Sequence, residues 1–186
     1  MIAIIDNYDS FTYNLVHYIE QFSPELKVFR SDKIKLSDLE KFNKIVISPG
    51  PGKPDEVPIL KQVILNFAKT KPILGVCLGM QAVAEFYGTK LLNMSHVLHG
   101  VKLKCNFDKD ESLFKGIKSP FEVGHYHSWI VDDKTLSPEI KVIARDNDNT
   151  IMAIKHVNYP LYGVQFHPES VLTPQGISLI KNWCKM

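Results

Sequence analysis

The sequence predicts an α/β protein with a mostly parallel central sheet, helices on both faces and antiparallel additions. Short apolar runs alternate with helix-like segments through the first half, and such alternation implies a parallel sheet covered on both faces. The second half carries short strand-like runs joined by turn-like residues, which favours antiparallel strands. A chain of 186 residues, 45% of them hydrophobic, is long enough for one domain spanning residues 1–186 with a sizeable core.

The first half is expected to form four strands, each followed by a helix. The strands are predicted at Ile2–Asp6, Leu26–Arg30, 44–48 and Ile73–Val76, because each is a short and largely apolar run. A helix at 11–21 has Asp9 or Ser10 as a candidate N-cap, and the pattern at 37–40 has the form of a capping box. Apolar residues at helical spacing over 59–67, and the segment 78–87, predict the other two helices.

In the second half, six short strands are predicted, at 91–94, 101–106, 121–124, 140–145, Ile151–His156 and 163–166. A helix at 174–183, with Pro174 at or near its first turn, closes the chain. We expect these strands to extend the parallel sheet in antiparallel fashion. No repeat, low-complexity tract or linker divides the sequence.

Composition excludes several classes of function. A net charge of +2 gives no electrostatic case for nucleic acid, which a clustered basic face would favour. No apolar run approaches the roughly 20 residues of a membrane span, and the N-terminus lacks the basic region of a signal peptide. The three cysteines, Cys77, Cys105 and Cys184, are far apart and form no disulfide framework or zinc motif. A reducing cytoplasm fits this cysteine content.

Cys77 lies in the stretch Gly75-Val76-Cys77-Leu78-Gly79, which has the form of a nucleophile elbow with Cys in place of Ser. Glycines on both sides allow a tight strand-to-helix turn, and the positive end of the following helix favours a thiolate. The amides of that helix, with the N–H of Leu78 foremost, are placed to stabilise an oxyanion. The alternative is a buried cysteine that packs as a small hydrophobic residue.

A thiol nucleophile needs a base, and the stretch 163–170, GVQFHPES, supplies a candidate. Residues two apart in an extended chain point to the same side, so Glu169 can reach His167 and fix its tautomer. The alternative is a structural histidine beside a solvent-facing glutamate. His125 and His127 resemble a metal pair but lack a third ligand. Surface or turn roles are expected for the other histidines, His17, His96, His99 and His156.

The stretch Ser48-Pro49-Gly50-Pro51-Gly52 follows the third predicted strand. Ligands of open α/β sheets bind at the carboxyl ends of strands. Two glycines allow backbone N–H groups to approach a substrate closely, and two prolines stiffen the loop. It lacks the Lys-Ser/Thr of a phosphate-binding loop, so a second oxyanion donor or a grip on a substrate carbonyl or carboxylate is the functional interpretation. A rigid turn is the alternative.

Taken together, GVCLGMQA, SPGPG and GVQFHPES resemble the class I (triad) glutamine amidotransferases. The opening DNYDSFTYN, the stretch Tyr126-His127-Ser128 and the pair His99-Gly100 are similar to the small subunits of the anthranilate and aminodeoxychorismate synthases. The resemblance runs from Ile2 to Trp183 in matching order and spacing. It implies the flavodoxin-like fold of the amidotransferase class.

The resemblance implies roles for particular residues. Cys77 would attack the glutamine carboxamide, His167 would deprotonate the thiol and protonate the departing ammonia, and Glu169 would orient His167. The backbone amides of Leu78 and Gly52 would hold the oxyanion. The implied glutamine-binding residues are Gly50, Pro51, Gly52, Leu78, Gln81, Ser128 and Trp129. Two positions depart from many relatives: Met80 stands where His is common, and Trp129 where Leu is common.

The resemblance also implies a partner. The family passes ammonia to a large, chorismate-binding synthase subunit that carries Mg²⁺, so no cofactor or metal is expected on this chain. We therefore expect a heterodimer or heterotetramer, with anthranilate as the product or, alternatively, aminodeoxychorismate. Two rival hypotheses are a γ-glutamyl hydrolase or other cysteine peptidase of the same fold, and a catalytically silent regulatory subunit.

Overall fold

The computed structural model covers residues 1–186 and describes the side chains of residues 1–94 and 99–186. The strands are β1 Ile2–Asp6, β2 Leu26–Arg30, β3 Lys44–Ile47, β4 Ile73–Val76, β5 Leu91–Phe107, β6 Phe121–Val131, β7 Ile140–Asp146, β8 Ile151–His156 and β9 Leu161–Val164. The α-helices are α1 Thr12–Glu20, α2 Leu36–Leu39, α3 Pro58–Phe67, α4 Leu78–Phe86 and α5 Gly176–Lys185. Three 3₁₀ turns are η1 Pro54–Glu56, η2 Ser112–Phe114 and η3 Asp133–Thr135.

All strands belong to one nine-stranded sheet in the order β2-β1-β3-β4-β9-β8-β7-β5-β6. The pairs from β2 through β9 are parallel, and the pairs from β9 through β8, β7 and β5 to β6 are antiparallel. The predicted fold class, a mostly parallel sheet with antiparallel additions, is confirmed. The chain runs from β1 to β2 on one side and then to β3 on the other, so a topological switch point lies beside β1.

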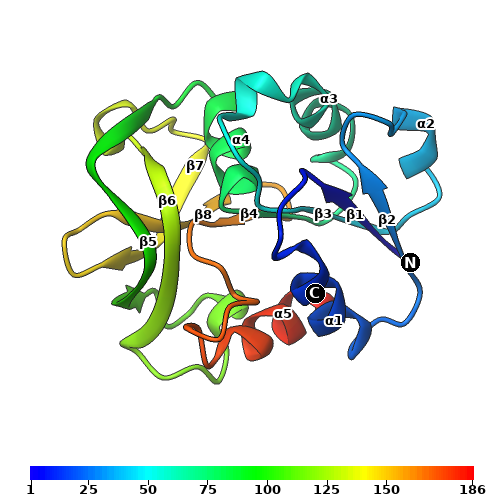
Figure 1. Ribbon diagram of the computed structural model, residues 1–186. Helices are drawn as coiled ribbons and strands as arrows, with labels where there is room; N and C mark the ends of the chain where they lie inside the picture. The colour runs from blue at the N-terminus through cyan, green and yellow to red at the C-terminus, as the bar shows by residue number, and fades with distance from the viewer.

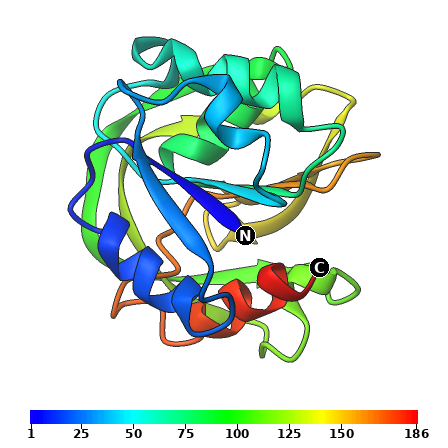
Figure 2. The ribbon, with the colours of Figure 1, turned by 90° about the vertical axis from the view of Figure 1, so that its right-hand side faces the viewer.

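Helices cover the sheet on both faces (Figures 1 and 2). In Figure 1, α3 and α4 lie above the sheet, and α1 and α5 lie below it. The side chains of β1 show why two layers form, because successive residues of a strand point to opposite faces. Ile2 and Ile4 join the apolar cluster that includes α1 and α5. Ala3 and Ile5 join the cluster that includes α3 and α4.

The edge of the sheet formed by β5 and β6 differs from the sequence prediction. Two short strands were expected at 91–94 and 101–106, but a single strand of 17 residues covers both. The strand β6 extends over 11 residues, well beyond the predicted 121–124. Register shifts interrupt the β5–β6 pairing, and Gly100 has a φ of +69°. These register shifts let one strand continue through the residues between the two apolar runs, which the apolar pattern did not indicate.

Helix starts also differ from the predicted caps. Neither Asp9 nor Ser10 is the N-cap of α1, although the Asp9 carboxylate accepts a hydrogen bond from the Phe11 N–H at 2.8 Å. The helix α2 begins at Leu36 rather than after Ser37, because Asp38 accepts from the Lys35 N–H at 2.9 Å. Pro174 lies two residues before α5, which begins at Gly176. Across the part of the chain that the structure describes, no helix is long and apolar enough to cross a membrane.

Candidate active site

Four loops that carry the predicted site follow the carboxyl ends of β1, β3, β4 and β9, which are neighbouring parallel strands. The loop after β3 carries Gly50-Pro51-Gly52, Cys77 follows β4, and His167 follows β9. Carboxyl ends of parallel strands meet at one edge of the sheet, beside the switch point. The sheet topology therefore gathers segments from the whole length of the chain.

Cys77 sits on a sharp turn between β4 and α4. Its φ of +50° and ψ of −101° are rare for a residue with a side chain, and its N–H donates to the Val164 carbonyl at 2.8 Å. The flanking glycines are required by space: a Cβ on Gly75 would lie 2.4 Å from the Gly79 backbone, and one on Gly79 would lie 2.6 Å from the Ile47 carbonyl oxygen. This is the geometry of a nucleophile elbow, as the sequence predicted.

His167 and Glu169 form a buried pair. The Nδ1 of His167 lies 2.8 Å from Oε1 of Glu169, and each residue is 2% exposed. The His167 backbone N–H donates to the Gly124 carbonyl at 3.1 Å, and its carbonyl accepts from the Thr173 hydroxyl at 2.7 Å. The Pro168 turn thus holds the His-x-Glu segment rigidly, and the two side chains meet as predicted.

The environment of His167 favours its charged form. Burial disfavours a charged ring, but the Cys77 thiol and the Glu169 carboxylate outweigh that penalty and raise the pKa of His167 to about 10. Its Nε2 is buried and makes no hydrogen bond of ordinary geometry to any described group. His167 therefore holds a proton at neutral pH, and no described side chain or backbone group accepts a hydrogen bond from its Nε2.

Aromatic rings fix the face of His167. Phe11, from the loop after β1, meets the imidazole edge-on at a centroid distance of 5.4 Å, and Tyr126 on β6 does so at 4.9 Å. The Tyr126 hydroxyl lies 2.9 Å from the hydroxyl of Ser170. Motifs that are distant in the sequence thereby surround one ring, and rotation of that ring is restricted.

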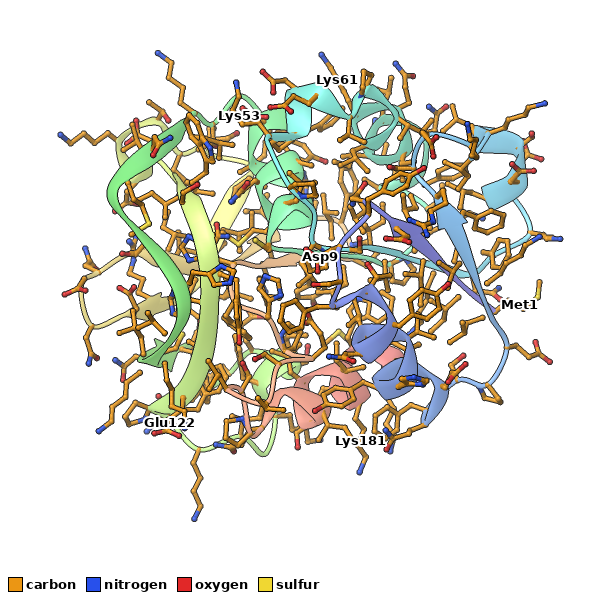
Figure 3. All side chains as sticks on the ribbon, in the orientation of Figure 1. Met1, Asp9, Lys53, Lys61, Glu122 and Lys181 are labelled. Atoms are coloured by element: carbon orange, nitrogen blue, oxygen red, sulfur yellow. The ribbon has the colours of Figure 1, made fainter. Side chains whose placement is uncertain are left out.

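A pocket of about 150 Å³ opens at Cys77. It is lined by Gly50, Pro51, Gly52, Cys77, Gln81, Tyr126, His127, Ser128 and Trp129. The predicted glutamine-binding residues all line it except Leu78, which directly follows Cys77 as the first residue of α4. Lys53, labelled at the upper edge of Figure 3, lies 5.6 Å from the centre of the Trp129 ring.

The loop 48–52 is held against the loop after β1. Asn7 donates its backbone N–H to Ser48 Oγ at 2.9 Å and its Nδ2 to the Ser48 carbonyl at 3.0 Å. Gly50 packs so closely that a Cβ there would lie 2.6 Å from Cβ of Asn7 and 2.7 Å from Cδ2 of Leu78. Only glycine at position 50 allows the loop 48–52 to approach Asn7 and Leu78 this closely. The loop is therefore fixed before any substrate arrives.

Several side chains of the site were not assigned a role from the sequence. Gln165 is fully buried and donates from Nε2 to the Sγ of Cys77 at 3.5 Å. Its position two residues before His167 is the only sequence signal that places it on the same side. Phe11 was seen only as part of a motif, and its contact with His167 could not be inferred without the fold.

His125 and His127, at the pocket on β6, form a buried pair that the sequence did not assign to the site. Nδ1 of His125 lies 3.0 Å from Nε2 of His127, and both residues are buried. Burial lowers the pKa of His125 to about 4 and that of His127 to about 3, so both rings are neutral at pH 7. Among the described side chains, no group of three or more His, Cys, Asp or Glu is placed to hold a metal ion.

The other described histidines, His17, His99 and His156, do not line the pocket. His17 is exposed, and His99 meets the edge of Tyr126. His156 is buried, and its Nδ1 accepts from the N–H groups of Asn158 and Tyr159 in the turn after β8, which confirms the turn role among the two roles expected for it. His96 lies outside the described side chains.

The site thus places a cysteine on a strained strand-to-helix elbow and a buried His–Glu pair at one edge of a flavodoxin-like sheet. Residues 3–186 match the model of the glutamine amidotransferase class-I family, and the chain belongs to that family. Anthranilate synthase component 2 of Cyanidium caldarium is 49% identical, with 100% of this chain and 98% of that protein covered. The corresponding predictions of family and of glutamine amidotransferase activity are confirmed.

Other relatives widen the comparison. Aminodeoxychorismate/anthranilate synthase component 2 of Bacillus subtilis is 42% identical, covering 98% of this chain and 95% of that protein. The bifunctional protein TrpGD of Thermotoga maritima is also 42% identical, but the chain spans only 31% of its length. Among solved structures, a putative GMP synthase subunit from Thermoplasma acidophilum superposes with a TM-score of 0.88 at 25% identity, over 99% of this chain and 92% of that one.

Proposed function

We propose that this chain hydrolyses glutamine at Cys77 and passes the ammonia to a chorismate-using synthase subunit that makes anthranilate. The observation that carries the proposal is the pocket of about 150 Å³ whose wall contains the elbow cysteine, with the His167–Glu169 pair behind it. The relative with 49% identity, named as an anthranilate synthase component, supports the choice of product.

The first half of the reaction forms a thioester. The Cys77 sulfur, paired as a thiolate with protonated His167, attacks the side-chain carbonyl carbon of glutamine. The carbonyl oxygen becomes an oxyanion, which the backbone N–H groups of Leu78 and Gly52 stabilise. His167 then donates its Nε2 proton to the amide nitrogen, the carbon–nitrogen bond breaks, and ammonia leaves.

The second half restores the enzyme. Water attacks the thioester carbon, and neutral His167 takes a proton from that water. The second tetrahedral intermediate expels the sulfur as thiolate and releases glutamate, so that the sum is glutamine plus water giving glutamate plus ammonia. Glu169 keeps Nδ1 of His167 occupied throughout, which leaves Nε2 as the nitrogen that moves protons.

Glutamine recognition falls to the rest of the pocket. Gly50, Pro51 and Gly52 face Gln81, Ser128 and Trp129 across it. Gln81 donates from Nε2 to the Trp129 carbonyl at 3.0 Å, which fixes both residues. Trp129 acts mainly through its backbone here, so an indole at this position is compatible with binding.

A partner is required because free ammonia is mostly protonated in water at neutral pH and is then a poor nucleophile. The relatives are named as second components of synthases. We place chorismate and Mg²⁺ on a large synthase subunit, in a cytoplasmic heterodimer or heterotetramer. The loop after β1, where Figure 3 labels Asp9, carries Tyr8 at 54% exposure, and the first turn of α1 carries Tyr13 at 56%; this loop and turn form the proposed docking face.

Aminodeoxychorismate is the second candidate product. Aminodeoxychorismate synthase component 2 of Escherichia coli is 44% identical over 98% of this chain, and the relative from Bacillus subtilis is named for both products. The amidotransferase subunit delivers the same ammonia in either case. The partner therefore decides the product, and it is identified by co-purification followed by analysis of what forms from chorismate and glutamine.

The test uses the complex with that large subunit. Cys77→Ser is expected to abolish glutamine-dependent synthesis and leave ammonia-dependent synthesis intact. Cys184→Ser, at a half-buried cysteine near the end of α5, is the matched control and should retain both. Glutamine-dependent synthesis that survives in Cys77→Ser would favour a silent regulatory subunit. Preferential cleavage of a γ-glutamyl peptide would favour a hydrolase.

Coupling to the partner is measured separately. The isolated chain is expected to hydrolyse glutamine weakly or not at all, and addition of the large subunit should raise the rate. Full turnover by the isolated chain would overturn the coupling between the subunits while leaving the amidotransferase chemistry in place.

A further inference from the structure

Gln165 lies beside the nucleophile because of the sheet register. In the parallel pair β4–β9, Gly75 is opposite Gly163 and Val76 is opposite Val164. The next residues along each strand are Cys77 and Gln165, so their backbones emerge side by side at the carboxyl edge. The Gln165 backbone is fixed by its own N–H, which donates to the Met152 carbonyl at 2.8 Å.

The side chain of Gln165 is fully buried and its amide is used at both ends. Nε2 donates to Sγ of Cys77 at 3.5 Å, and Oε1 accepts from Nε2 of Gln81 at 3.3 Å. A buried amide normally satisfies its groups with the backbone or with neighbouring polar side chains. Here one partner is the reacting atom and the other is a residue of the substrate pocket.

The donor at the sulfur has a chemical consequence. Hydrogen bonds to a charged acceptor are roughly twice as strong as those between neutral groups. A bond from Gln165 is therefore worth more once the thiol has become a thiolate, and it points the sulfur in one direction. It also leaves the Nε2 proton of His167 free for the leaving nitrogen, because the sulfur does not depend on His167 alone.

The acceptor at Gln81 has a second consequence. With Nε2 of Gln81 held by both Gln165 and the Trp129 carbonyl, its amide plane is fixed and its Oε1 is left for the pocket. Gln81 is itself 2% exposed, so it has little freedom to turn. A movement of the Gln165 amide would thus change the hydrogen bond to the Cys77 sulfur and the position of Gln81 in the substrate pocket.

We propose that Gln165 is a catalytic residue of this site, whose amide holds Cys77 Sγ by its donor end and Gln81 by its acceptor end. The inference rests on the proposed glutamine hydrolysis and deepens it. It predicts that the two ends of the amide have separable effects, one on the reactivity of the sulfur and one on substrate affinity.

The first experiment needs neither glutamine nor the partner. The rate of Cys77 alkylation by iodoacetamide is measured by mass spectrometry in the wild type, Gln165→Glu and Gln165→Met. Gln165→Glu keeps an acceptor for Gln81 but replaces the donor, and Gln165→Met removes both. We expect both rates to fall roughly 10- to 100-fold, the range for losing a hydrogen bond to a charged group.

Gln62→Glu, on the exposed face of α3, is the matched control, because it makes the same change of charge outside the pocket and should alkylate at the wild-type rate. Folding of every variant is checked by circular dichroism. Rates within about twofold of wild type in folded Gln165 variants would overturn the proposal. Because iodoacetamide is not a substrate, that result is distinguishable from a failure of the proposed function, which would appear as no glutamine turnover in the complex.

The second experiment separates the two ends of the amide in the complex with the large subunit. Gln165→Glu is expected to lower kcat with a KM for glutamine near that of the wild type, whereas Gln165→Met should lower kcat and raise KM several-fold. Equal effects of both variants on KM alone would contradict the role at the sulfur. A structural role would change stability without this split.

A third measurement leaves Gln165 unchanged. In two-dimensional NMR of the isotopically labelled protein, the side-chain amide resonances of Gln165 should shift on Cys77→Ala, and those of Gln62 should not. The absence of a shift at Gln165 would overturn the contact itself. This measurement decides the proposal even if neither Gln165 variant folds.

Discussion

The strained backbone at Cys77 leads to a prediction whose sign runs against the usual rule. With a φ of +50° and a ψ of −101°, the backbone of Cys77 has a conformation that is strained for a residue with a Cβ but that glycine adopts freely. Such residues cost about 1–3 kcal/mol each. Replacing Cys77 by Gly releases that strain, while replacing it by Ala keeps the Cβ and therefore keeps the strain. Both variants lose the sulfur, so its contacts cancel in the comparison.

The magnitude follows from three terms. Relief of strain favours Gly by about 1–3 kcal/mol, whereas the greater freedom of glycine in the unfolded chain opposes it by about 0.4–1 kcal/mol and the lost burial of the Cβ opposes it by about 0.8 kcal/mol. We expect Cys77→Gly to be more stable than Cys77→Ala by up to about 1 kcal/mol, with a Tm higher by up to about 2–4 °C for a chain of this size. Urea unfolding of the two variants measures the difference.

Ala84→Gly, inside α4, is the control of opposite sign. Glycine there should destabilise the protein by about 1 kcal/mol through helix propensity, with a further loss from the buried methyl group. If Cys77→Gly is no more stable than Cys77→Ala, the strain at the elbow is not stored in the backbone of this residue, and the argument is refuted.

Three further predictions concern the base, the elbow and the response to acid. Glu169 is among the groups that hold the pKa of His167 at about 10 against burial, so Glu169→Gln should move the alkaline limb of the pH–rate profile to lower pH and reduce kcat by about 100-fold. An unchanged profile would contradict the pairing. Gly75→Ala should destabilise the protein by about 1–3 kcal/mol, because its Cβ would lie 2.4 Å from the backbone of α4; a wild-type melting curve would refute this. The unfolded chain binds protons at His125 and His127 near pH 6.5, whereas the native pKa values are about 4 and about 3. As the pH is lowered from about 6 to 4, the free energy of unfolding, measured in urea, should therefore fall by up to ~1.4 kcal/mol per pH unit for each histidine. The double variant His125→Phe/His127→Phe should not show this fall.

The parallel half of the fold was predictable mainly because β1, β3 and β4 are buried on both faces and read as short apolar runs. Ile2–Asp6, Leu26–Arg30 and Ile73–Val76 match their predicted bounds. A short run of apolar residues bounded by turn residues has few other stable arrangements. The neighbouring strands β5 and β6 have no such pattern, because many of the described residues of β5 are exposed and register shifts interrupt the pairing of the two strands. Their length is set by pairing with each other, which is information that neither segment carries alone.

In the candidate site too, some residues were predictable from local sequence and others depend on pairing between strands. Cys77, His167 and Glu169 were identified because local spacing determines their geometry. An elbow needs glycines at two fixed positions, and the His-x-Glu spacing brings the two side chains together, although through the turn at 167–170 and not through the extended chain that was assumed. Gln165 was not, because its partner Cys77 is set by the register between two strands. The β4–β9 register brings Gln165 to the sulfur, and no periodicity within either strand encodes it.

The loop after β1 explains why a conspicuous motif can lie outside the reacting atoms. Asp6 is buried and accepts hydrogen bonds from the Tyr8 N–H and the Thr12 hydroxyl, both at 2.9 Å, which fixes the loop at its root. From there Asn7 holds the loop 48–52, and Phe11 packs on His167. One rigid segment thus touches both the proposed oxyanion loop and the base. We therefore expect a displacement of this segment to disturb both the loop 48–52 and His167, because Asn7 and Phe11 belong to one short segment whose start is fixed by Asp6.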